Sequence, residues 1–129
     1  MPTRRNIITL AAVAAFMPVK LAQAAVTEFT MEAFKAAQKA GKPILVDVWA
    51  SWCPTCKAQG PILKSFLADP KNKDMVMLRV NFDTQLDVLK AFNVQSQSTL
   101  IVFKGAKETG RSVGDTDAGS ISALLSSAI

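Results

Sequence analysis

The most constraining feature of this chain is a run of apolar residues at 44–49 that contains one acid and is followed within four residues by a cysteine. An apolar run without polar alternation is typical of a strand that is buried on both faces of a sheet. Such strands occur in α/β proteins, where helices cover both faces of the sheet. The run therefore predicts an α/β domain with residues 44–49 as a central strand.

Helical and strand patterns alternate along the rest of the chain. Thr30 is placed to cap a helix over residues 31–40, and Thr84 to cap a short helix over residues 85–92. Pro54 suits the first turn of a helix, where a missing N–H costs nothing. Further helices are expected at 54–67 and 118–128, and further strands at 26–29, 75–82, 100–103 and 108–113. The pattern predicts one domain with a central mixed sheet of four to five strands, flanked by helices.

Cys53 and Cys56 are the only cysteines, and the chain has no histidine. Two thiols at this spacing can form a tight, easily reduced disulfide. A bridge kept for stability usually closes a longer loop. A zinc site needs about four ligands, so it would require a dimer or carboxylates. Copper binding would draw on Met75 and Met77, whose apolar neighbours favour a place in the core. The pair therefore favours a redox-active dithiol, with metal binding as the alternative.

The position of each cysteine suggests its role. Cys53 is expected at a helix N-terminus, where free N–H groups and the helix dipole favour a thiolate. Cys56, one turn further on, is shielded and suited to resolve a mixed disulfide. Asp47 is unusual because an ionised acid in a buried strand is costly unless it is paired. It is expected to pair with a cation such as Arg79, to accept the Cys56 proton through a water, or to do both.

Residues 1–24 have the organisation of an export signal. A positive region with Arg4 and Arg5 precedes about ten apolar residues, and Ala22-Gln23-Ala24 offers the small residues that a signal peptidase recognises. The apolar run is too short to cross a membrane. The paired arginines favour the twin-arginine route, with the Sec route or an uncleaved anchor as alternatives. Cleavage leaves residues 25–129 with twelve basic and ten acidic residues, so nucleic-acid binding is not indicated.

The chain resembles the thioredoxin family in residues 44–57, 61–63 and 99–105, and the resemblance extends over nearly all of the predicted mature chain. It implies a thioredoxin fold and dithiol–disulfide exchange without a cofactor or metal. It also implies that Cys53 attacks, Cys56 resolves, the two form a redox-active disulfide, and Asp47 manages the proton. Relatives often carry a lysine near that acid, at the position of Arg79. The residues expected to contact substrates are Trp52, Pro54, Thr55, Gln97, Ser98 and Gly114, the last a glycine that lets a substrate chain approach.

The sequence departs from the family at two places. Pro54 and Thr55 separate the cysteines, and the absence of histidine there favours a reductant or a mild exchanger over a strong oxidant. Relatives nearly always have a cis-proline at the position of Ser98. A cis bond before a non-proline residue costs about 2.5–4 kcal/mol, so we expect a trans Gln97–Ser98 bond and a reshaped loop. Ser98 could then contact the sulfur of Cys53.

These observations predict an exported thiol–disulfide oxidoreductase that reduces disulfides of periplasmic proteins as a monomer. A membrane thiol transporter is the expected electron donor. One alternative is a disulfide oxidant or isomerase that uses the same dithiol. The other is a protein that binds copper or an iron–sulfur cluster between two protomers. In relatives the proline at the position of Ser98 keeps metal away from the cysteines, and this chain lacks it.

Overall fold

The computed structural model describes residues 26–129, so the predicted signal at 1–24 lies outside the described part. The strands are β1 (Thr27–Glu28), β2 (Pro43–Trp49), β3 (Val76–Asn81), β4 (Thr99–Lys104) and β5 (Lys107–Val113). The helices are α1 (Met31–Lys39), α2 (Pro54–Ala68), α3 (Leu86–Ala91) and α4 (Ala118–Ser126), with a 3-10 turn at Pro70–Asn72. Within this range no helix is long and apolar enough to cross a membrane.

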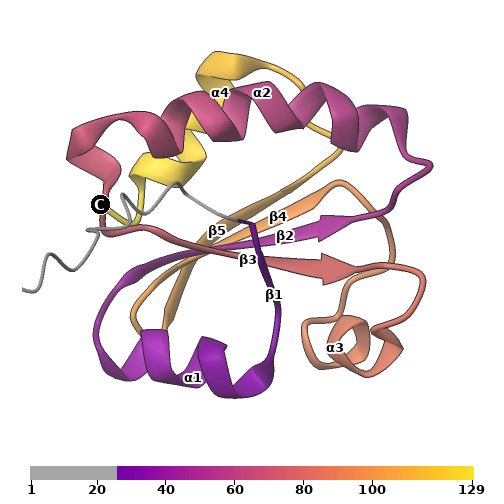
Figure 1. Ribbon diagram of the computed structural model, residues 1–129, viewed down its shortest axis with the longest axis horizontal. Coiled ribbons are helices and arrows are strands. Elements are labelled where there is room, and N and C mark those ends of the chain that lie inside the picture. The colour runs from indigo at the N-terminus through magenta and orange to yellow at the C-terminus, as the bar shows by residue number, and fades with distance from the viewer. Residues whose placement is uncertain (1–25) are drawn as a thin grey trace, which may run out of the picture.

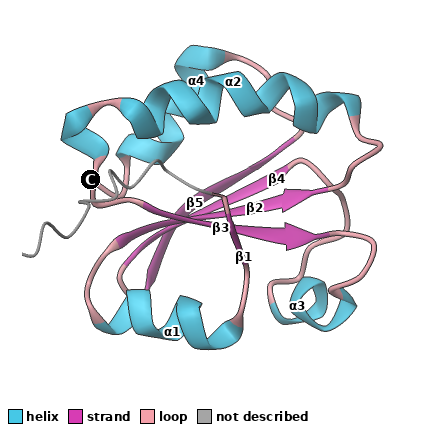
Figure 2. Ribbon diagram, viewed as in Figure 1, coloured by secondary structure: helices cyan, strands magenta, loops and turns pink. Residues whose placement is uncertain are grey.

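The strands form one mixed sheet in the order β1-β3-β2-β4-β5. β3 runs parallel to both β1 and β2, whereas β4 runs antiparallel to both β2 and β5. Helices α2 and α4 cover one face of the sheet, and α1 and α3 cover the other (Figure 1). Figure 2 shows the same layers by type of structure. The predicted α/β fold, a central mixed sheet flanked by helices, is confirmed with five strands.

β2 is the middle strand, and its side chains alternate between two cores. Ile44, Val46 and Val48 pack in the core that includes residues of α1 and α3. Leu45 packs in the core that includes residues of α2 and α4. Both faces of β2 are covered, which explains why its sequence is apolar throughout. By the same alternation Asp47 lies on the face covered by α2.

The predicted cap is confirmed at α1 and wrong at α3. The Thr30 side chain caps α1 as predicted, because its Oγ1 accepts a hydrogen bond from the N–H of Ala33 at 3.0 Å. The predicted Thr84 cap of α3 is wrong. Gln85 occupies the cap position without a side-chain cap bond, and its Oε1 accepts instead from the N–H of Asn81 at 2.9 Å. β1 is two residues long, shorter than the predicted strand at 26–29.

Candidate functional site

The two cysteines lie where β2 passes into α2. The chain leaves β2 at Trp49, turns, and enters α2 at Pro54, so that Cys53 is the N-cap residue. The Cys53 Sγ accepts a hydrogen bond from the backbone N–H of Cys56 at 3.1 Å. The thiol therefore does what a serine or aspartate side chain does at other helix N-termini. Both cysteines are free and buried in this structure, with 0% of Cys53 and 4% of Cys56 exposed.

Ser98 lies against both thiols. Its Oγ is 3.0 Å from the Cys53 Sγ and 3.2 Å from the Cys56 Sγ, and only 2% of the residue is exposed. No cis peptide bond occurs within residues 26–129, so the Gln97–Ser98 bond is trans, as predicted. Ser98 has a φ of 63°, in the left-handed region that costs a residue with a side chain roughly 1–2 kcal/mol. The expected contact with Cys53 is confirmed, and a second contact, with Cys56, was not foreseen.

The pKa values of the two thiols are shifted in opposite directions. Burial acts to raise the pKa of Cys53, but hydrogen bonds from the Cys56 thiol, the Ser98 hydroxyl and the backbone N–H groups of Cys56 and Thr55 outweigh it, so this pKa lies below the usual value. Burial raises the pKa of Cys56, and its hydrogen bond to Cys53 raises it further, against the opposing contact with Ser98. Cys53 therefore forms a thiolate more readily than Cys56, and the thiolate is the nucleophile of disulfide exchange.

Asp47 and Arg79 are partners on neighbouring strands. Their Cα atoms are in register between β2 and β3, and Oδ2 of Asp47 accepts hydrogen bonds from Nε and Nη2 of Arg79 at 3.3 and 3.2 Å. The guanidinium also lies 4.8 Å from the centre of a ring of Trp49. Burial raises the pKa of Asp47 even though Arg79 lowers it. The predicted ion pair is confirmed, and the proton-transfer role stays a prediction.

Gln59 belongs to the site although its role was not predicted from the sequence. It is 1% exposed, and its Nε2 donates to the backbone carbonyls of Ser98 at 3.3 Å and Asp115 at 2.8 Å. The side chain thus joins α2 to the two loops that flank the thiols. Among the described residues its Oε1 has no hydrogen-bond partner. The spacing of three residues after Cys56, on the buried face of a helix, was the signal that could have found it.

The other predicted substrate-contact residues differ in their exposure and in their hydrogen-bond partners. Trp52 is 55% exposed, and its Nε1 donates to both oxygens of the Asp83 carboxylate, at 3.2 and 3.0 Å. Gly114, with a φ of 72°, donates its N–H to the Ser98 carbonyl at 3.0 Å, and a Cβ there would meet open space. The structure therefore brings Gly114 beside Ser98, next to the dithiol. Pro54 is exposed, whereas Thr55 and Gln97 are half-buried.

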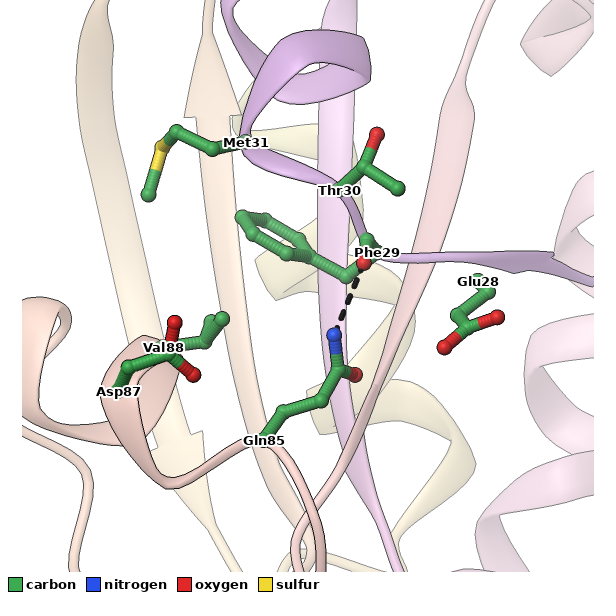
Figure 3. A pocket seen from close by; sticks show the side chains of 7 residues that line it. All are labelled: Glu28, Phe29, Thr30, Met31, Gln85, Asp87 and Val88. Carbon is green, nitrogen blue, oxygen red and sulfur yellow. Dashed lines mark hydrogen bonds between the residues drawn. The ribbon is translucent and has the colours of Figure 1, made fainter.

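Away from the thiols, a hollow of about 330 Å³ lies between the start of α1 and α3. Figure 3 shows that Gln85 reaches across it to donate a hydrogen bond to the Phe29 carbonyl, at 2.9 Å. Its lining carries the acids Glu28 and Asp87 but neither cysteine. Within residues 26–129, no three histidine, cysteine, aspartate or glutamate side chains are grouped so that they could hold a metal ion. The buried thiols, with Ser98 against both, form the candidate site.

Comparisons with known proteins agree with this geometry. The sequence profile of the family described as Thioredoxin matches residues 25–127. The crystal structure of Trxlp from Edwardsiella tarda is 43% identical, with a TM-score of 0.75, and the match covers 78% of this chain and 97% of that one. The chain belongs to the thioredoxin family, and its site is that of a thiol–disulfide oxidoreductase with Cys53 and Cys56 as the redox pair.

Curated relatives match over part of their length. The thioredoxin of Mycobacterium tuberculosis is 38% identical over 73 residues, which is 57% of this chain and 62% of that protein. The bifunctional thioredoxin reductase/thioredoxin of Mycobacterium leprae is 36% identical over 73 residues, which is 57% of this chain and 16% of that protein. The chain thus spans less than two thirds of the length of either relative.

Proposed function

We propose that the protein is exported and that it reduces disulfides of proteins in the periplasm. The observation that carries the proposal is the lowered pKa of the Cys53 thiol at the start of α2, and the signal-like pattern of residues 1–24 supports export. The absence of histidine between the cysteines supports reduction over strong oxidation, because it leaves no imidazolium to stabilise the thiolate further. The electrons are supplied by a membrane thiol transporter, and the protein works as a monomer.

The reaction exchanges one disulfide for another. The Cys53 thiolate attacks a substrate disulfide, forms a mixed disulfide and releases one substrate thiolate, which takes up a proton. The Cys56 thiol loses its proton and attacks the Cys53 sulfur, which releases the second substrate thiolate, and this one also takes up a proton. The products are a reduced substrate and the Cys53–Cys56 disulfide. Two electrons and two protons from the donor dithiol then restore the starting state. Asp47 accepts the Cys56 proton through a water.

The reduction potential of the pair tests the direction of electron flow. We expect a value of roughly −270 mV, close to that of thioredoxin, when the protein is equilibrated with glutathione or dithiothreitol. The reduced protein should also reduce the disulfides of insulin at a catalytic concentration. A potential near roughly −120 mV, typical of a strong oxidant, would show that the protein oxidises its substrates instead.

Export is tested by fractionation of bacterial cells that express the full chain. We expect the periplasmic form to begin at Ala25, as determined by mass spectrometry, because Ala22 and Ala24 match a signal-peptidase site. Replacing Arg4 and Arg5 together by lysine should block export if the twin-arginine route is used. Unchanged export of that variant would identify the Sec route. Full-length protein that stays in the cytoplasm would contradict the proposal.

A further inference from the structure

The Ser98 hydroxyl is buried between the two reacting sulfurs. In the described part of the chain its hydrogen-bond contacts are the Cys53 Sγ, at 3.0 Å, and the Cys56 Sγ, at 3.2 Å. A hydroxyl has one hydrogen to donate and two lone pairs with which to accept. It can therefore accept from one thiol while it donates to the other sulfur. Both hydrogen bonds form when one sulfur is a thiol and the other is a thiolate.

The neighbouring groups decide which atom donates in each of these hydrogen bonds. The Cys53 Sγ already accepts the backbone N–H of Cys56, at 3.1 Å, which stabilises negative charge on that sulfur. The Cys56 thiol has one hydrogen, which it can donate to the Cys53 sulfur or to the Ser98 oxygen at 3.2 Å, and the Ser98 oxygen is nearer than the Val48 carbonyl at 4.0 Å. In either case the Ser98 hydroxyl is free to donate to the Cys53 thiolate.

Three hydrogen bonds to the backbone of Ser98 hold the residue in this position. Its N–H donates to the Val48 carbonyl at 2.8 Å, and its own carbonyl accepts from the N–H of Gly114 at 3.0 Å and from Nε2 of Gln59 at 3.3 Å. These bonds keep the residue at a positive φ, a conformation that side chains seldom adopt. A strained residue that is fixed in this way against two reactive sulfurs indicates a functional position.

We propose that Ser98 is a catalytic residue of the dithiol, whose hydroxyl donates a hydrogen bond to the Cys53 thiolate before attack and to the Cys56 thiolate after the mixed disulfide has formed. The proposal rests on the disulfide reduction proposed above and deepens it. The hydroxyl gains and loses no proton overall. In the first step it stabilises the nucleophile, and in the second it turns to the sulfur that carries the charge once Cys53 is bonded to the substrate.

Two variants test the proposal together. Ser98→Ala and Ser98→Gly both delete the hydroxyl, but glycine adopts a positive φ without strain. In both, the rise of thiolate absorbance at 240 nm should move to higher pH by the same amount. Reduction of a small disulfide at pH 7 should slow about three- to tenfold, because the loss of thiolate is partly offset by a more basic and more nucleophilic sulfur. Ser96→Ala is the matched control, since that hydroxyl donates to the Gln97 carbonyl, at 3.0 Å.

The possible outcomes separate this inference from the proposed function. If both variants titrate and react like the parent, Ser98 is not catalytic, while the proposed function stands. If Ser98→Ala is impaired and Ser98→Gly is not, the residue acts through its backbone and the inference is wrong. If the parent reduces no protein disulfide, the proposed function fails, but the titrations still decide whether the hydroxyl stabilises the thiolate. Should the alanine variant fail to fold, the glycine variant decides.

Discussion

Cys56→Ser is expected to accumulate covalent complexes with substrate proteins, whereas Cys53→Ser is expected to accumulate none. Cys53 has the lowered pKa and caps α2, so it forms the mixed disulfide. Cys56 has the raised pKa and resolves that intermediate. Without the Cys56 sulfur the intermediate persists, and without the Cys53 sulfur it never forms. Both variants should lose reduction of insulin by about a thousandfold or more, as expected when a member of a joint nucleophilic unit is removed.

The complexes are measured on non-reducing gels of extracts from cells that express each variant. Bands above the monomer should appear with Cys56→Ser, disappear on treatment with dithiothreitol, and yield the substrates by mass spectrometry. A double variant that lacks both thiols is the control for non-covalent association. Equal trapping by the two single variants would show that either cysteine can attack, which would contradict the assigned roles.

Asp47→Asn is expected to make the protein more stable at pH 8 and to slow its reaction. Burial raises the pKa of Asp47, so the native state binds this proton more tightly than the unfolded chain does. The cost of the buried charge is absent below the unfolded pKa, near 3.8, grows as pH rises through the raised native pKa, and is constant above it. Removing the charge should therefore stabilise the protein at pH 8, by about 1.4 kcal/mol for each pH unit by which the native pKa exceeds the unfolded one.

Urea unfolding at pH 3.5 and pH 8 measures this difference, which should nearly vanish at the lower pH. Asp74→Asn, which alters an exposed acid, is the control and should change the stability little. Arg79→Met should destabilise the protein at pH 8, because Asp47 would lose its partner, and adding Asp47→Asn should reverse that loss. Resolution of the mixed disulfide should slow at least about tenfold in Asp47→Asn if the carboxylate takes the Cys56 proton. A stability gain with no change in rate would leave Asp47 a purely structural acid.

Much of the fold could be predicted because several signals agreed with one another. The apolar run at 44–49 identified the central strand, and the position of Pro54 identified the start of α2. The Asp47–Arg79 pair was predictable because an isolated charge in a buried strand needs a partner on the next strand. The cap of α3 was not, since the Asn81 and Gln85 side chains organise the turn that Thr84 was expected to end.

The site was predictable where it depends on local sequence and less so where it depends on tertiary contacts. The cysteines and Asp47 lie within ten residues of each other. The contacts of Gln59 and Ser98 instead join segments that are far apart in the sequence. Gln59 bonds to Ser98 and Asp115, which are 39 and 56 residues away. The absence of proline at Ser98 led to the prediction of a trans bond there, which is confirmed. That one hydroxyl reaches both sulfurs depends on the backbone angle at that residue.

The complete burial of Cys53 has a consequence for the lifetime of the reduced protein. A sulfur with no accessible surface cannot be reached by a small oxidant or an alkylating reagent until a neighbouring segment moves away. Ser98 lies against this sulfur, so a movement of the turn that carries it is one way to expose the sulfur. A protein disulfide that binds at this turn and displaces it would gain access that a freely diffusing reagent lacks. Such an arrangement would favour reaction with protein disulfides over reaction with small reagents.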